Sequence, residues 1–88
     1  GRAIAVLAHE AWHLHGEASE ALANCFGYQS GVAVGVELGL SEARARQLMR
    51  EQLATNVSDY ANNPGYLVPS GCHNDGPYDL RPRDPAFP

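Results

Sequence analysis

Two histidines and a glutamate near the start of the chain are spaced so that they could act on one metal ion. His9 and His13 are four residues apart, which on a helix places them on one face, about 40° apart. Neutral imidazole nitrogens bind Zn²⁺ at about 2.0–2.1 Å, and a catalytic zinc site keeps one position open for water. Glu10 is rotated by about 100° from His9, which favours it as the base that takes a proton from this water. The spacing predicts a zinc site with two histidine ligands and Glu10 as the catalytic residue.

Such a site needs a third protein ligand. Gly16 allows the chain to reverse after the first helix, and Glu20 then lies in the first turns of the next helix, close to His13. A carboxylate there would complete a His₂Glu set. Glu17, an aspartate of the tail and a group outside this chain are the alternatives, although Glu17 falls too close to the turn to aim easily at the metal. We therefore predict His9, His13 and Glu20 as the metal ligands.

The segment before the motif is apolar. Residues 3–8 are apolar on nearly every face, which predicts a buried helix. Ionisable side chains are costly to bury unless they are paired or bind a metal. This context argues against the alternative that the spacing arose by chance.

The rest of the pattern predicts a mainly α-helical fold of three helices, with the motif on the first. Gly16 and Gly39 favour helix ends in the left-handed cap position, and Ser41 is a good N-cap for the third helix. No strand of convincing length is expected, although Tyr66–Val68 could add a short one to an edge that this chain does not supply. The expected helices cover about Ala3 to His15, residues 17–19 to Leu38, and Ser41 to about Ala61.

The prolines divide the chain into two parts. All six lie between Pro64 and Pro88, so residues 63–88 are expected to form an irregular tail that packs on the core. Residues 1–62 then form the helical, metal-binding core. The apolar stripe of the third helix consists of Ala45, Met49, Leu53, Val57 and Tyr60, with Leu48 beside it.

A row of glycines marks one face of the second helix. Gly27, Gly31, Gly35 and Gly39 recur every four residues, and Ala23 extends the row. A helical glycine costs roughly 1 kcal/mol relative to alanine, which the close approach of another backbone can offset. We expect close packing within the chain, with a homodimer seam as the alternative.

The motif resembles that of the zincin metallopeptidases. H-E-x-x-H at residues 9–13, followed by E-x-x-A-N at residues 20–24, is closest to gluzincins in their smallest form, the mini-zincins and related bacterial proteins. In that family the two histidines and the later glutamate bind zinc, and the motif glutamate is the catalytic base. The resemblance covers residues 8–27 well and implies the helical part of a minimal zincin fold.

Two features depart from the family pattern. The interval from His13 to Glu20 is short for a gluzincin. Members of the family also carry a sheet before the motif helix, whose edge strand binds the peptide substrate, and only eight residues precede His9. The resemblance therefore implies an upstream segment of the same protein.

Several residues outside the motif have a candidate role. An oxyanion could be stabilised by His73, Tyr66 or Tyr78, although an exposed loop residue is the alternative for His73. Cys25 and Cys72 could form a disulfide that closes a loop of roughly 47 residues and contributes about 4 kcal/mol in the entropy model. Two free thiols in a reducing cytosol are the alternative, and a cytoplasmic location is slightly favoured over secretion.

Composition argues against two classes of partner. The net charge is −4, and the six basic residues are all arginines that form no basic stripe, so nucleic acid is not expected. The apolar runs at residues 3–8 and 31–38 are too short to span a bilayer. The sequence thus predicts a zinc-dependent metallopeptidase acting on a peptide or protein substrate. A non-catalytic zinc-binding module and a helical interaction domain are the alternatives.

Overall fold

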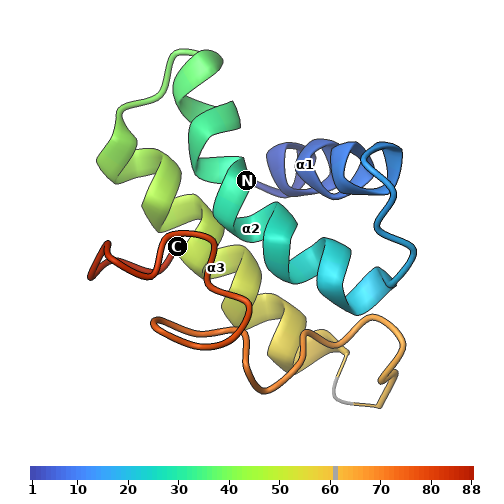
Figure 1. Ribbon diagram of the computed structural model, residues 1–88. Coiled ribbons are helices and arrows are strands. Elements are labelled where there is room, and N and C mark those ends of the chain that lie inside the picture. The colour runs from blue at the N-terminus through green and yellow to red at the C-terminus, as the bar shows by residue number, and fades with distance from the viewer. Residues whose placement is uncertain (61) are drawn as a thin grey trace.

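Three α-helices precede an irregular tail in the computed structural model, which describes residues 1–60 and 62–88 (Figure 1). The predicted mainly helical fold, with the H-E-x-x-H motif on the first helix, is confirmed. Ala61, where the third helix was expected to end, lies outside the described residues. Within the described part of the chain Tyr66–Val68 forms no strand. The helices are α1 (Arg2–Leu14), α2 (Glu20–Glu37) and α3 (Glu42–Asp59).

The helix ends follow from local chemistry. Ser19 and Ser41 are the N-caps of α2 and α3, and their Oγ atoms accept hydrogen bonds from the backbone N–H groups of Leu22 and Arg44. The chain reverses after α1 at Gly16, whose φ of 100° is in the left-handed region that favours glycine. This reversal brings the start of α2 beside the end of α1.

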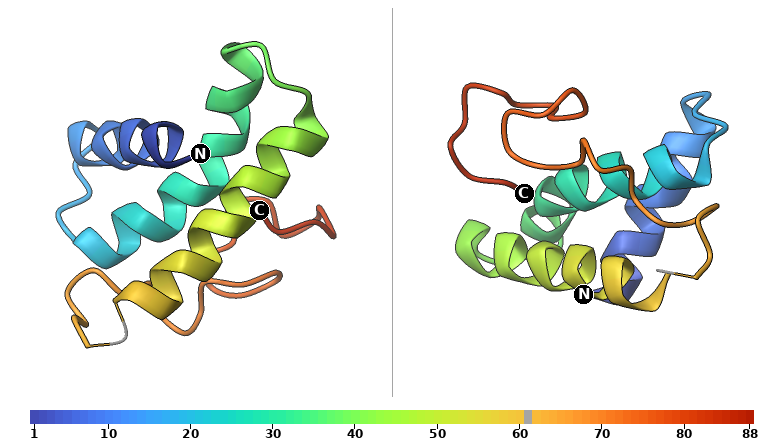
Figure 2. Two further views of the ribbon diagram at one scale, coloured as in Figure 1. Left: turned by 180° about the vertical axis from the view of Figure 1, so that it is seen from behind. Right: turned by 90° about the horizontal axis from the view of Figure 1, so that it is seen from below.

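The glycine row of α2 lets both other helices approach closely. Gly27 lies against the backbone of His9 on α1, whereas Gly31 and Gly35 lie against Met49 and Ala45 on α3. The row therefore packs within the chain, as expected, and these three glycines are buried by its own helices. Figure 2 shows α2 between the other two helices, with α2 and α3 antiparallel.

Two expectations about burial were wrong. The first helix packs mainly on α2, so its outer face remains in solvent, with Val6 52% and Leu14 90% exposed. On α3, Val57 is 53% exposed, whereas its neighbour Asn56 is only 1% exposed. Asn56 follows the buried Met49 by two helical turns and lies on the same face. Its side-chain amide can be buried because it forms hydrogen bonds with backbone groups of the tail.

The tail is held against the helices at separate points. Cys25 of α2 and Cys72 form a disulfide with a Cα–Cα distance of 5.9 Å, which confirms that the two lie within bridging distance. Further along, the Gln29 amide bonds the backbone of Tyr78 and Leu80 on the tail. The carboxylate of Asp84 lies 2.9 Å from Arg46 of α3.

Among the described residues, none of the helices has the length and hydrophobicity needed to span a lipid bilayer.

Candidate metal centre

The two motif histidines meet the carboxylate of Glu20 where the end of α1 lies beside the start of α2. Glu20 Oε1 lies 2.7 Å from His13 Nε2, and Glu20 Oε2 lies 3.3 Å from His9 Nε2. The two Nε2 atoms are 2.9 Å apart. The carboxylate of Glu17 turns away to accept a hydrogen bond from the Ser19 N–H. The structure thus brings together the three residues predicted as ligands and leaves Glu17 in the turn.

The opposite nitrogen of each ring is held by a hydrogen bond. His13 Nδ1 lies 2.6 Å from the carbonyl oxygen of Glu17, and His9 Nδ1 lies 2.6 Å from Asn24 Oδ1. Because Asn24 Nδ2 donates to the carbonyl of Tyr66 at 2.8 Å, the orientation of the amide is determined and its oxygen faces His9. Both rings therefore donate through Nδ1–H, which leaves both Nε2 atoms as acceptors or metal ligands.

This arrangement favours a cation at the centre. When both rings are neutral, the lone pairs on Nε2 of His9 and His13 face one another, and the Glu20 carboxylate faces both. Three electron-rich groups at these distances repel one another unless a proton or a metal ion lies among them.

Without a metal ion, a proton on His13 can relieve this repulsion. The hydrogen bond to the Glu17 carbonyl raises the pKa of His13, desolvation opposes the rise, and the carboxylates of Glu20 and Glu10 add to it. The net direction is upward from the usual value. A metal ion at the centre must therefore displace this proton.

The donor set also fits a metal ion. Ligand atoms at the corners of a tetrahedron with 2.0–2.1 Å bonds are about 3.3 Å apart. Here the two Nε2 atoms are 2.9 Å apart, and the two oxygens of Glu20 lie 2.7 Å from His13 Nε2 and 3.3 Å from His9 Nε2. The closest pair, Glu20 Oε1 and His13 Nε2, would need to spread by about 0.6 Å to reach this geometry. Imidazole and carboxylate ligands suit zinc and several other divalent metals.

Glu10 offers a second carboxylate at the same centre. Its Oε1 lies 3.9 Å from His9 Nε2, whereas Glu20 Oε2 lies 3.3 Å from the same atom. The side chain of Glu10 is 65% exposed. Donor atoms of His9, Glu10 and His13 lie within 4.8 Å of one another, so this group could also hold a metal ion. Both donor sets use the two histidines and differ only in which glutamate completes them.

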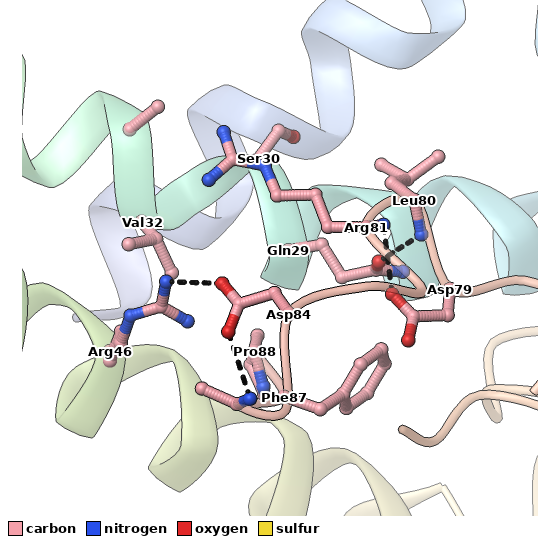
Figure 3. A pocket seen from close by; sticks show the side chains of 12 residues that line it. Gln29, Ser30, Val32, Arg46, Asp79, Leu80, Arg81, Asp84, Phe87 and Pro88 are labelled. Carbon is pink, nitrogen blue, oxygen red and sulfur yellow. Dashed lines mark hydrogen bonds and ion pairs between the residues drawn. The ribbon is translucent and has the colours of Figure 1, made fainter. Parts of the chain in front are cut away.

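The centre opens into a cleft of about 460 Å³ between α1 and the second half of α3. Glu10, Glu20 and His9 line it, and so does Tyr66, one of the three candidates for oxyanion stabilisation. The other two lie elsewhere: Tyr78 packs on Phe26, and His73 Nδ1 bonds the carbonyl of its neighbour Asn74 in the tail. A second cavity of about 120 Å³, between α2, α3 and the tail, contains no histidine (Figure 3).

Two asparagines were missing from the predicted site. Asn24 bonds His9 directly, and Asn56 donates to the same Tyr66 carbonyl at 3.0 Å and accepts from the Val68 N–H at 3.0 Å. The position of Asn24, one helical turn after Glu20, is a signal that could have identified it. Nothing local marks Asn56, because its partners lie in the irregular segment after α3.

No family model matches this chain, and neither the curated proteins nor the solved structures compared with it show a match.

Proposed function

We propose that this protein is a zinc-dependent metallopeptidase. The observation that carries the proposal is the convergence of His9 Nε2, His13 Nε2 and the Glu20 carboxylate at the edge of an open cleft. Both rings are oriented by hydrogen bonds at Nδ1, as is common for metal-binding histidines. We assign His9, His13 and Glu20 as the ligands of zinc, which when bound supplies Lewis-acid activation of water and of a carbonyl group.

Glu10 is the proposed general base. Its exposed carboxylate borders the same centre and lines the cleft, so it can take a proton from water at the mouth of the site. The same carboxyl group can then pass this proton to the leaving amine. Because Glu10 lines the cleft, we propose that an extended peptide substrate binds in this cleft.

Tyr66 is the proposed donor to the developing oxyanion. Among the three candidates, it is the one that lines the cleft, and the residue is 42% exposed. A phenol can donate a hydrogen bond to an oxygen that gains negative charge in the transition state.

Metal analysis and one isosteric variant test this function. The chain purified without chelator should carry about one Zn²⁺, and the His9→Ala, His13→Ala double variant should carry none. Glu10→Gln should keep its zinc and lose peptide cleavage, because it keeps the size of the side chain and removes the basic oxygen. Zinc without any cleavage by the wild-type chain would favour the non-catalytic zinc-binding module instead.

The same variants decide which glutamate is the ligand. Glu20→Ala should weaken zinc binding strongly, and Glu17→Ala should change it little. Loss of zinc from Glu10→Gln would make Glu10 a ligand, and the mechanism would then need another base.

The disulfide bears on where this chemistry takes place. Disulfides form and persist mainly in oxidising compartments, and Cys25–Cys72 is such a bond. We therefore propose an oxidising compartment in place of the cytoplasm that was slightly favoured from the sequence. The protein can be isolated in the presence of an alkylating reagent, which blocks any free thiol before it can oxidise. If neither cysteine is alkylated, the result supports this location.

A further inference from the structure

A pair of tyrosines forms one wall of the cleft beside the metal centre. The rings of Tyr60 and Tyr66 have centroids 5.7 Å apart and an interplanar angle of 32°. Both residues line the cleft. The carbonyl of Tyr66 bonds Asn24, whose other end bonds His9. The aromatic pair is thus one amide side chain away from a predicted metal ligand.

Asp59 adds an acidic group to the same wall. It lines the cleft, its side chain is exposed, and among the described residues it forms no ion pair. Asp59 is also the last residue of α3, where a carboxylate meets the negative end of the helix dipole and opposes helix stability. Stability of the helix therefore does not account for an acidic residue at this position.

The other charges of the cleft leave Asp59 available. Glu20 faces the two histidines, and Glu10 is assigned to proton transfer. The one arginine of the lining, Arg2, follows Gly1, which lies against Gln52 of α3, seven residues before Asp59, or about 10 Å along the helix. Near the tyrosines the cleft is therefore aromatic and acidic.

We propose that Tyr60, Tyr66 and Asp59 bind a cationic side chain of the peptide substrate, with arginine preferred. Aromatic faces attract cations, and a planar guanidinium can stack on a ring while it pairs with a carboxylate. This inference rests on the proposed peptidase function and names the chemical class of a substrate side chain that the cleft would bind.

Two small probes of nearly the same shape test the pocket without any cleavage. Nα-acetyl-argininamide is titrated into the zinc-loaded chain and followed by NMR, with the neutral isostere Nα-acetyl-citrullinamide as the matched probe. The arginine probe should shift the resonances of Tyr60 and Tyr66 and bind at least tenfold more tightly than the citrulline probe. Equal affinity of the two probes, or shifts confined to other parts of the chain, would overturn the proposal.

Variants separate the charge, the aromatic face and the phenol. Asp59→Asn and Tyr66→Ala should each weaken binding of the arginine probe at least threefold, whereas Tyr66→Phe keeps the aromatic face and should retain it. Asp75→Asn is the control, because Asp75 is exposed and lies outside the cleft. A loss of affinity in Asp75→Asn as large as in Asp59→Asn would show that only the net charge of the protein matters, and would reject the pocket.

The failure of this proposal and that of the proposed function have different signatures. Zinc content and cleavage of an unbiased peptide mixture test the peptidase, and the probe titration tests the pocket. Cleavage with no preference for arginine or lysine, together with equal probe affinities, rejects the pocket alone. Selective probe binding in a protein that cleaves no peptide rejects the peptidase and leaves a binding site for cationic side chains.

Discussion

Gly27 of α2 lies against the backbone of His9, so that a Cβ atom placed on Gly27 would be 3.1 Å from the His9 nitrogen and 3.2 Å from its Cα. These distances are tighter than ordinary van der Waals contact. The obstacle is backbone, which cannot rotate away as a side chain can. The missing side chain at Gly27 thus sets how closely α1 approaches α2 directly behind His9, a proposed metal ligand.

Gly27→Val should therefore push α1 away and disturb the centre. We expect a loss of about 1–3 kcal/mol in the free energy of unfolding, as for other overpacked sites, and a weaker affinity for zinc. Ala33→Val is the matched control, because it places the same side chain on the exposed face of α2. Thermal unfolding and zinc titration of both variants provide the measurement. Equal behaviour of the two would show that the close contact at Gly27 does not position His9.

Asn24 is expected to matter for metal affinity rather than for folding alone. Asn24→Ala removes the acceptor of the His9 Nδ1–H, and loss of such a partner typically weakens metal binding by about 10–100-fold. Asn24→Asp keeps an oxygen at this position and should preserve most of the affinity. Zinc affinities measured by competition with a chelator decide the matter. An affinity of Asn24→Ala within twofold of wild type would mean that the hydrogen bond does not orient the ring.

The sequence was most informative where spacing along one element decides the geometry. The four-residue interval between His9 and His13 places both rings at one centre on any helix, and Gly16 marks the reversal that brings Glu20 beside them. The proximity of Cys25 and Cys72 was also predicted, because the irregular tail has few apolar residues to anchor it to the helices.

The errors arose where burial depends on packing between distant segments. Apolar residues around α1 predicted a buried helix, but this helix packs mainly on α2, and Val6 and Leu14 remain exposed. On α3, Asn56 rather than Val57 is buried because the segment after the helix supplies hydrogen-bond partners for the Asn56 amide. These partners are the Tyr66 carbonyl and the Val68 N–H. Hydrophobic periodicity contains no information about such partners.

The buried Asn56 should make a large contribution to stability. Asn56→Leu keeps a similar volume but leaves the buried Val68 N–H without its acceptor, at a cost of about 1–3 kcal/mol for the unpaired group. The neighbouring Val57→Asn exchange, on the exposed side, should change stability by less than about 0.5 kcal/mol. Urea unfolding with an unchanged slope gives the comparison. If Val57→Asn lost more stability than Asn56→Leu, Val57 rather than Asn56 would lie on the buried face of α3.

The disulfide should be a major source of stability for the tail. It closes a loop with a sequence separation of 47 residues, for which the entropy model gives about 4 kcal/mol. The Cys25→Ala, Cys72→Ala double variant and the reduced wild-type chain should therefore unfold at much lower urea concentrations than the oxidised wild-type chain. The two unfolding midpoints should be similar to each other. If reduction left the unfolding midpoint unchanged, the other contacts of the tail would be sufficient to hold it.

The raised pKa of His13 predicts opposite effects of pH on the metal-free and the zinc-loaded protein. A pKa above the ordinary value of 6.5 in the folded chain means that folding favours the protonated ring. In the metal-free chain this stabilisation is complete below pH 6.5 and is lost as the pH rises through the pKa of the folded state. Zinc needs the unprotonated ring, so its affinity falls as the pH falls through the same range.

The measurement compares wild type with His13→Gln, because the difference between the two isolates the contribution of the His13 ring from that of the other titratable groups. The difference in melting temperature between the two metal-free proteins should shrink as the pH rises, while zinc affinity of the wild type increases. His15→Gln is the control: His15 is exposed, and its replacement should leave both pH profiles in place. If the melting-temperature difference instead grew toward high pH, the neutral His13 ring would be the stabilising form, and the electron-rich cluster would not need a cation to be stable.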